Sequence, residues 1–169
     1  MTKPSMHPEV TVVASTPDHA VGHRGPVALY VWRRETLPSA VAAFEESLRL
    51  AALDGGGTCV LFGAAEPQAS FPSSEIRTTL ARIFRHDSSI VASAFTFEGQ
   101  GIRPTAARNV ANAITILARQ PFPHRFFSSL ADAARWTLRE ASPRGVALPT
   151  EAALVDALQQ LRASPCVAD

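Results

Sequence analysis

Three serines stand close together between a predicted strand and a predicted helix, next to an acidic and an aromatic residue. They are Ser70, Ser73 and Ser74, and the same stretch contains Glu66 and Phe71. A serine at a helix N-terminus suits phosphorylation, because the positive end of the helix dipole stabilises added negative charge. The same position is where serine commonly caps a helix with its hydroxyl oxygen. The sequence leaves both interpretations open, and capping is the more common role.

The loop 64–71 and the first turn of the helix after it are the predicted contact with a protein partner. Phe71 offers an apolar side chain of the kind that concentrates binding energy at an interface. A phosphate on Ser73 or Ser74 would lie beside Glu75, and the repulsion between the two would favour release of a partner that accepts the unmodified loop.

A second pattern that suits ligand chemistry is Gly99-Gln100-Gly101, followed by Arg103. Backbone amides at a glycine-rich turn before a helix can hold an anion, and the arginine would assist them. A dinucleotide fingerprint is excluded, because its third glycine would fall where Pro104 stands. The alternative is a tight turn that joins a strand to a helix.

Two histidines four residues apart, His19 and His23, raise the question of a metal site. Zinc needs at least three protein ligands on a helix face or a shaped loop. Both histidines fall in residues 16–26, whose prolines and glycines predict a loop, so we expect no metal. The sequence has no Walker loop and no Gly-x-Ser-x-Gly or His-Glu-x-x-His motif. We therefore expect no cofactor, and the sequence favours binding over catalysis.

Composition narrows the classes of partner. The net charge of +1 gives no general attraction for nucleic acid or an anionic membrane. The two cysteines, Cys59 and Cys166, make no disulfide framework. No apolar run is long enough to span a bilayer, and residues 1–8 lack the apolar stretch of a signal peptide. We therefore expect a cytoplasmic location.

Strand-like and helix-like segments alternate along the chain and predict one α/β domain. The predicted strands are 9–15, 27–33, 57–63, 88–97 and 123–127. The predicted helices are 37–53, 72–86, 104–119, 129–140 and 150–162. This order, ββαβαβαβα plus a C-terminal helix, predicts a single domain with a five-stranded, mixed, mostly parallel sheet and flanking helices. Residues 1–8 are predicted to be a flexible tail, 9–140 the domain, and 141–169 a linker, a helix and a tail.

The predicted core combines apolar residues from the strands with the apolar stripes of the helices. Its members are Val31, Phe44, Leu48, Leu61, Ile83, Val91, Phe95, Ile114 and Leu117. The last helix has a stripe of Leu154, Leu158 and Leu161, which suits packing on the domain or contact with a partner.

The order and length of the elements resemble the STAS group, the fold of sporulation anti-sigma factor antagonists and their SpoIIAA-like relatives. Glu98-Gly99-Gln100-Gly101 after the fourth predicted strand and the stretch from Pro123 to Trp136 add to the resemblance. It implies a mostly parallel sheet with an antiparallel first strand, and a regulatory role through protein binding. The phosphorylated Asp-x-Ser-Gly motif of that family is absent, so the chain resembles a divergent member.

The sequence therefore favours a non-catalytic, cytoplasmic regulatory module that binds another protein. The alternative is a small-molecule site, or an enzyme, at the strand C-termini near Glu66, Ser70 and Glu98. A third alternative is a subunit that self-associates into a homo-oligomer through an open sheet edge.

Overall fold

The structure, a computed structural model, describes residues 9–99, 108, 112, 114 and 119–167. Its centre is a six-stranded sheet in the order β1-β2-β3-β4-β5-β6. The strands are β1 (Thr11–Ser15), β2 (His19–Arg24), β3 (Val27–Trp32), β4 (Cys59–Ala65), β5 (Ile90–Phe97) and β6 (His124–Phe127). Strands β3 to β6 are parallel, whereas β2 runs antiparallel to both β1 and β3.

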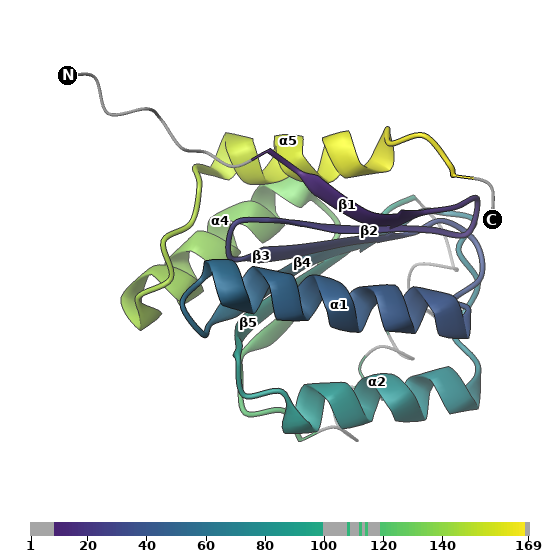
Figure 1. The fold of residues 1–169 in the computed structure, drawn as a ribbon, viewed down its shortest axis with the longest axis horizontal. Helices are drawn as coiled ribbons and strands as arrows, with labels where there is room; N and C mark the ends of the chain where they lie inside the picture. Colours follow the sequence, from purple (N-terminus) through teal and green to yellow (C-terminus); the bar gives the residue numbers. More distant parts are fainter. Residues whose placement is uncertain (1–8, 100–107, 109–111, 113, 115–118, 168–169) are drawn as a thin grey trace.

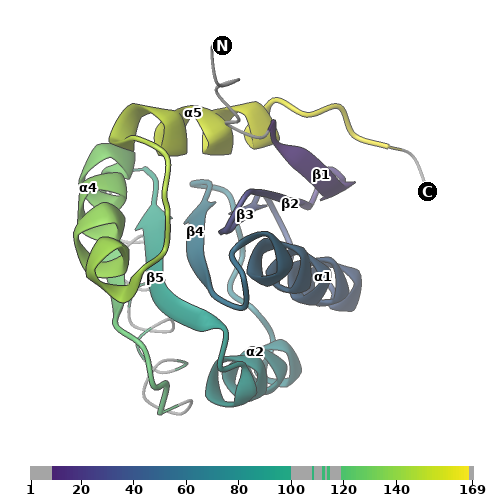
Figure 2. The ribbon, with the colours of Figure 1, turned by 60° about the vertical axis from the view of Figure 1, so that its left-hand side comes forward.

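Helices cover both faces of this sheet (Figures 1 and 2). Helices α1 (Pro38–Asp54) and α2 (Ser74–His86) lie on one face, which we call the α1/α2 face. Helices α4 (Leu130–Ala141) and α5 (Glu151–Arg162) lie on the other, the α4/α5 face, and a short 3-10 turn, Ser142–Arg144, follows α4. The α/β class and the single mixed sheet are as predicted from the sequence.

The predicted strand count was wrong by one, because residues 19–24 form β2 rather than a loop. The β2–β3 hairpin pairs Arg24 with Val27, so only Gly25 and Pro26 make the turn. Gly25 has φ +52°, which suits the first central position of the mirror-image turns that join twisted strands. Of the residues that predicted a loop, Pro17 precedes β2, Gly25 and Pro26 form the turn after it, and Gly22 lies within the strand. The carbonyl oxygen of Thr11 lies where a Cβ on Gly22 would be.

The direction of the strands also differs from what the family resemblance implies. The first strand, β1, pairs antiparallel with β2 and so runs in the same direction as β3 to β6. The single antiparallel strand is β2, the one that the sequence pattern did not reveal.

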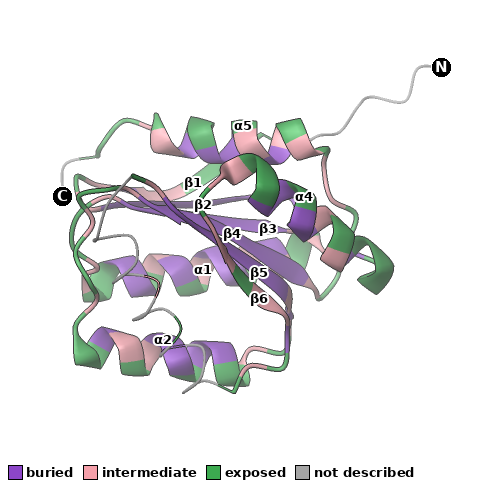
Figure 3. Cartoon of the chain, turned by 180° about the vertical axis from the view of Figure 1, so that it is seen from behind, coloured by how far each residue is buried: buried purple, intermediate pink, exposed green. Residues whose placement is uncertain are grey.

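Side chains that alternate along each strand build two separate apolar layers. In Figure 3 the central strands are coloured as buried, whereas the helices carry both buried and exposed residues. Of the predicted core, seven members are buried: Val31, Phe44, Leu48, Leu61, Ile83, Phe95 and Ile114. Val91 is only half-buried, because the strand register shifts between Cys59 and Val60 opposite it. Leu117 lies outside the described residues, as does most of the predicted helix 104–119.

The C-terminal helix packs on the domain. Leu154, Leu158 and Leu161 of α5 are completely buried against the α4/α5 face of the sheet. Beyond α5, the backbone amide of Val167 donates a hydrogen bond to the carbonyl oxygen of Ser15 at the end of β1. Among the residues that the structure describes, no helix is long and apolar enough to cross a membrane.

A candidate binding pocket beneath the loop 66–73

A pocket of about 90 Å³ opens on the α1/α2 face of the sheet, beneath the loop that joins β4 to α2. Strands β3, β5 and β6, helix α2 and the loop 66–73 all contribute to its walls. The lining residues are Tyr30, Trp32, Thr36, Phe44, Ala65, Ala69, Ser70, Phe71, Pro72, Leu80, Phe84, Phe95, Phe97, Ile114, His124 and Phe126. Aromatic side chains dominate this lining, and none of the described residues in it is an aspartate, glutamate, lysine or arginine.

The strands place these rings by their two-residue period. Residues i and i+2 of a strand point to the same face, so Tyr30 and Trp32 in β3 lie together over the sheet. The pair Phe95 and Phe97 in β5 and the pair His124 and Phe126 in β6 follow the same rule. Strands β3, β5 and β6 therefore each present an aromatic pair to the same pocket.

The rings touch one another and form a continuous wall. Tyr30 packs edge-on against Phe44 of α1, with ring centroids 5.0 Å apart, and stacks on Phe95 at 5.5 Å. Phe95 contacts Phe97 at 4.9 Å, and His124 packs against Phe126 at 4.5 Å. Edge-to-face pairs of this kind are stabilising beyond the area that they bury, so the wall has a defined geometry.

A glycine in the middle of β4 makes room for this wall. A Cβ on Gly63 would lie 2.4 Å from Cζ of Tyr30, so only glycine lets the tyrosine ring rest on the strand. The sequence pattern ended this strand at Gly63, but β4 continues to Ala65. Glycine weakens strands in general. At this position the lack of a side chain leaves the space that the Tyr30 ring occupies.

Among the described residues that line the pocket, the titratable side chains are Tyr30 and His124, and both pKa values lie far from pH 7. Burial raises the pKa of the Tyr30 phenol well above its usual range. Burial also lowers the pKa of the His124 imidazole to about 4. An efficient general acid or base needs a pKa near the working pH, so neither group is suited to proton transfer in neutral solution.

Two polar atoms on the pocket residues are buried without a hydrogen-bond partner. They are Oγ1 of Thr36, in the segment between β3 and α1, and Nδ1 of His124, at the start of β6. Neither residue has a charged side chain beside it in the lining. A buried polar group without a partner is unfavourable by about 1–3 kcal/mol, and most such groups in proteins are satisfied.

The residues of the predicted contact, the loop 64–71 and the first turn of α2, have different positions in the structure. Ser70 and Phe71 line the pocket, and the Phe71 side chain is 46% exposed. The Ser73 hydroxyl accepts a hydrogen bond of 3.3 Å from the backbone amide of Ile76, so Ser73 is the N-cap of α2. Ser74 is exposed in the first turn. Whether any of these serines is phosphorylated stays a prediction.

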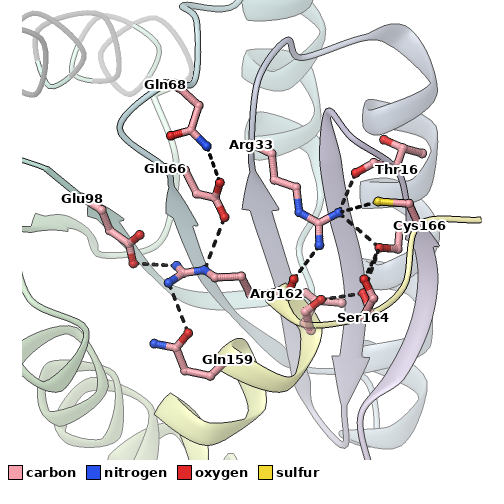
Figure 4. A network of polar contacts seen from close by, with 11 residues as sticks. Thr16, Arg33, Glu66, Gln68, Glu98, Gln159, Arg162, Ser164 and Cys166 are labelled. Carbon is pink, nitrogen blue, oxygen red and sulfur yellow. Dashed lines mark hydrogen bonds and ion pairs between the residues drawn. The ribbon is translucent and has the colours of Figure 1, made fainter.

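Glu66 and Glu98 do come together at the C-terminal ends of their strands, but around an arginine rather than around a ligand (Figure 4). Arg162, at the end of α5, donates from Nη2 to Glu98 at 2.5 Å. Its Nε lies 3.6 Å from the carboxylate of Glu66, which also accepts a hydrogen bond from Gln68. All three charged side chains are at least three-quarters buried. These carboxylates thus tie α5 to the sheet.

A second arginine continues this polar network toward the C-terminus (Figure 4). Arg33, just after β3, donates from Nη2 to the carbonyl oxygen of Arg162 at 2.7 Å and from Nη1 to that of Thr16 at 2.5 Å. Cys166 lies 3.6 Å from the same guanidinium group. The network joins the segments after β1 and β3 to the end of α5.

The predicted anion site cannot be assessed as a whole, since Gly101 and Arg103 lie outside the described residues. Gly99 is described and has φ +97°, with Pro67 at 3.0 Å from the position of a Cβ. A glycine is therefore required there by the turn after β5, in agreement with the alternative of a tight turn.

His19 and His23 lie on one face of β2, about 13 Å apart along the strand. The imidazole of His19 contacts the Thr16 hydroxyl at 3.2 Å, while His23 lies 3.3 Å from a carboxylate oxygen of Asp54. Positions i and i+4 of a strand are too far apart for their side chains to bind the same metal ion. Within the described part of the chain, no three histidine, cysteine or acidic residues are placed to hold a metal.

Comparisons with known proteins identify no relative of this chain. No family model, no curated protein and no solved structure matches the chain.

Ser70 and Phe71, which the sequence pattern singled out, lie at the rim of the pocket, whereas the residues of its walls were not predicted. The signal was present as Tyr30-x-Trp32, Phe95-x-Phe97 and His124-x-Phe126, three aromatic pairs at strand spacing. Each pair alone is ordinary core composition. Its meaning depends on the parallel pairing of β3 to β6, which sets the pairs side by side.

Proposed function

We propose that this chain is a non-catalytic binding module that holds one small apolar group in the pocket beneath the loop 66–73. The observation that carries the proposal is the wall of aromatic rings in the pocket, whose described lining residues are uncharged. Ligand sites in proteins are typically concave and apolar, with a few polar atoms that orient the ligand. Thr36, Ser70 and His124 are polar residues of the described lining.

The size of the pocket limits its occupant. An engineered apolar cavity of about 150 Å³ takes up benzene, and the present pocket is smaller, at about 90 Å³, but open to the surface. One ring or one branched alkyl group therefore suits it, with part of the occupant outside. A ligand of drug size would extend over the loop.

Binding is favoured over catalysis by the state of the ionisable groups. Neither Tyr30 nor His124 titrates near neutral pH, because burial shifts both pKa values away from it. The nearest acidic residues of the predicted alternative site, Glu66 and Glu98, are engaged by Arg162. The described residues of the pocket thus include no acid and base pair matched to a reaction at neutral pH.

The test is to fill the pocket and measure binding of small apolar probes. Calorimetry and ligand-observed NMR with benzene and toluene should show saturable binding to the parent protein. Ala69→Leu, which adds three carbons at the pocket wall, should weaken that binding at least tenfold. The matched control is Ala43→Leu, which changes a half-buried alanine of α1 that is not in the lining.

Two results would overturn the proposal. One is the absence of saturable binding of either probe to the folded parent. The other is equal weakening, or none, in the two leucine variants, with thermal unfolding used to confirm that both remain folded.

A protein partner is the second candidate, and the exposed rim of the pocket favours it. Phe71 is 46% exposed at the edge of the pocket, so a partner's apolar side chain could enter beside it. Buried anchors in pockets supply most of the energy of many interfaces. Under this candidate the chain is a divergent regulatory module of the STAS type, which the alternation of parallel strands and helices from β3 to α4 supports.

The protein candidate is tested by capturing a partner and measuring its affinity by calorimetry. Phe71→Ala should weaken binding by at least about 1 kcal/mol, a factor of about five. The double change Ser73→Glu/Ser74→Glu tests the effect of added negative charge in the same assay. If neither variant changes the affinity by that amount, the loop is not the contact.

A further inference from the structure

Helix α5 lies on the face of the sheet opposite to the pocket, yet its last residue is connected to the loop above the pocket (Figures 1 and 4). That residue is Arg162, and the loop is 66–73. We infer that Arg162 is a positioning residue for the pocket, which holds this loop in the form that binds an occupant. The inference rests on the proposed function, because it concerns the regulation of the same site.

The first connection runs through the side chain of Glu66, which follows directly after β4 and begins the loop. One of its carboxylate oxygens lies 3.6 Å from Nε of Arg162, and the other accepts a hydrogen bond of 2.6 Å from Gln68 (Figure 4). The carbonyl oxygen of Glu66 accepts a hydrogen bond of 3.0 Å from the backbone amide of Ala69. The residue that pairs with Arg162 therefore belongs to the same turn as Ala69, which lines the pocket.

The second connection runs through the backbone of Arg162. Its carbonyl oxygen accepts a hydrogen bond of 2.7 Å from Nη2 of Arg33. The carbonyl oxygen of the next residue, Arg34, accepts hydrogen bonds from the backbone amide of Ser70 at 2.8 Å and from the Ser70 hydroxyl at 3.2 Å. Because Ser70 also lines the pocket, two separate paths lead from Arg162 to the pocket wall.

The contacts of the Arg162 side chain are strong because they are sheltered from water. The side chains of Arg162, Glu66 and Glu98 are each at most 24% exposed. Hydrogen bonds between charged groups are stronger than those between neutral groups, and loss of one member of a buried ion pair leaves the other charge uncompensated. A loop that loses this connection samples more conformations. Binding must then bear the entropy of ordering it, so the affinity falls.

The test measures the affinity for toluene by calorimetry and the exchange rate of the Ser70 amide hydrogen by NMR. Glu66→Gln keeps the size of the side chain and leaves Arg162 paired with Glu98. Arg162→Met removes the guanidinium group and keeps an extended side chain. Each variant should bind toluene at least about fivefold more weakly than the parent, and in each the Ser70 amide should exchange faster. Should Arg162→Met not remain folded, Glu66→Gln decides the question by the same two measurements.

Arg135→Met is the matched control. Arg135 of α4 also pairs with an acidic residue of α5, because its Nη2 lies 3.2 Å from the carboxylate of Glu151. It is not among the described lining residues of the pocket. The affinity for toluene and the exchange of the Ser70 amide should both be as in the parent, with thermal unfolding used to confirm that the variant is folded. An effect equal to that of Arg162→Met would overturn the inference, because loss of either arginine would then disturb the pocket.

A double variant separates positioning of the loop from a general loss of stability. Arg162→Met and Glu66→Gln break the same path, so their effects on the affinity should not add. Once Glu66→Gln is present, Arg162→Met should weaken toluene binding little further. A double variant whose loss of affinity is the full product of the two single losses would show that Arg162 does not act on the pocket through Glu66.

The remaining outcomes separate this inference from the proposed function. If the parent binds toluene and both single variants bind it equally well, the inference is wrong and the apolar pocket stands. The inference is also wrong if the Ser70 amide exchanges at the parent's rate in both variants. If the parent itself binds neither toluene nor benzene, the proposed function fails and the inference falls with it.

Discussion

The two faces of the sheet are built from the same strands, yet they are packed differently. On the α4/α5 face, small and aliphatic side chains such as Ala64, Ala92 and Ala94 meet the leucines of α5 and the alanines of α4. On the α1/α2 face, the neighbouring strand positions carry Tyr30, Trp32, Phe95 and Phe97.

The difference teaches how one sheet can serve two purposes. Small residues let a helix approach the strands closely and fill the space with leucine, as dense interiors require. On the α1/α2 face large flat rings tilt against one another, and the pocket lies beside them beneath the loop 66–73. Both faces thus contribute a buried core, and the pocket for which we propose binding lies on the α1/α2 face.

The largest expected effect comes from truncating an enclosed side chain on either face. Phe44→Ala should reduce the free energy of unfolding by about 3–5 kcal/mol and Leu158→Ala by about 2–5 kcal/mol. Both side chains are almost completely buried. Because Phe44 lines the pocket, benzene should restore part of the stability of that variant only. Urea denaturation with and without benzene measures this, and a loss below about 1 kcal/mol for Phe44→Ala would show that α1 does not pack as described.

A methyl group added to β4 should test the aromatic face alone. Gly63→Ala places a Cβ in the Tyr30 ring, so the ring must move, at an expected cost of about 1–3 kcal/mol. The same change in a Tyr30→Leu background should cost much less, because the obstacle is gone. Equal costs in the two backgrounds, measured by urea denaturation, would mean that the strand itself requires the glycine.

The pH dependence of stability should differ once His124 is replaced. Its pKa is about 4 in the folded protein and 6.5 as the ordinary value, so the unfolded chain binds more protons between these limits. Stability is therefore complete above pH 6.5 and falls as the pH drops from 6.5 toward 4, with a loss of about 2 kcal/mol at pH 5. His124→Phe should remove this part of the acid sensitivity. Identical pH profiles for parent and variant would contradict the burial of the imidazole.

The smallest expected effect concerns the helix caps, because each face of the sheet has a helix with a side-chain cap. Ser73 caps α2 on the α1/α2 face, and Thr150 caps α5 on the other. Each alanine variant should cost about 1 kcal/mol of stability. Ser74→Ala is the control, and its cost should stay within about 0.5 kcal/mol, as for other surface changes. A cost for Ser74→Ala equal to that of Ser73→Ala would show that the cap is misassigned.

Much of the local structure follows from the sequence pattern. The stripe of Val41, Phe44 and Leu48 marks α1, and the helix ends within one residue of its predicted bounds. The Ser129 cap before Asp132 predicts the start of α4, and the structure has that hydrogen bond at 3.4 Å. These features depend on neighbours within one or two turns, so the order of residues is enough to specify them.

Features that depend on distant residues were not predictable in this way. β2 looks like a loop until its pairing with β1 and β3 is known, and Gly63 looks like a strand end until the Tyr30 ring covers it. Glu66 and Glu98 look like site residues until Arg162 of α5, remote in sequence, reaches them.

The chain order thus specifies that there are strands, helices and caps, because these arise from periodicity and local hydrogen bonding. The folded arrangement specifies the pocket, because its described walls include residues of four strands, two helices and a loop that meet only when the parallel register is formed. Each aromatic pair within a strand follows the strand period, but the contacts that join pairs from different strands, such as Tyr30 with Phe95, leave no signal in the order of residues.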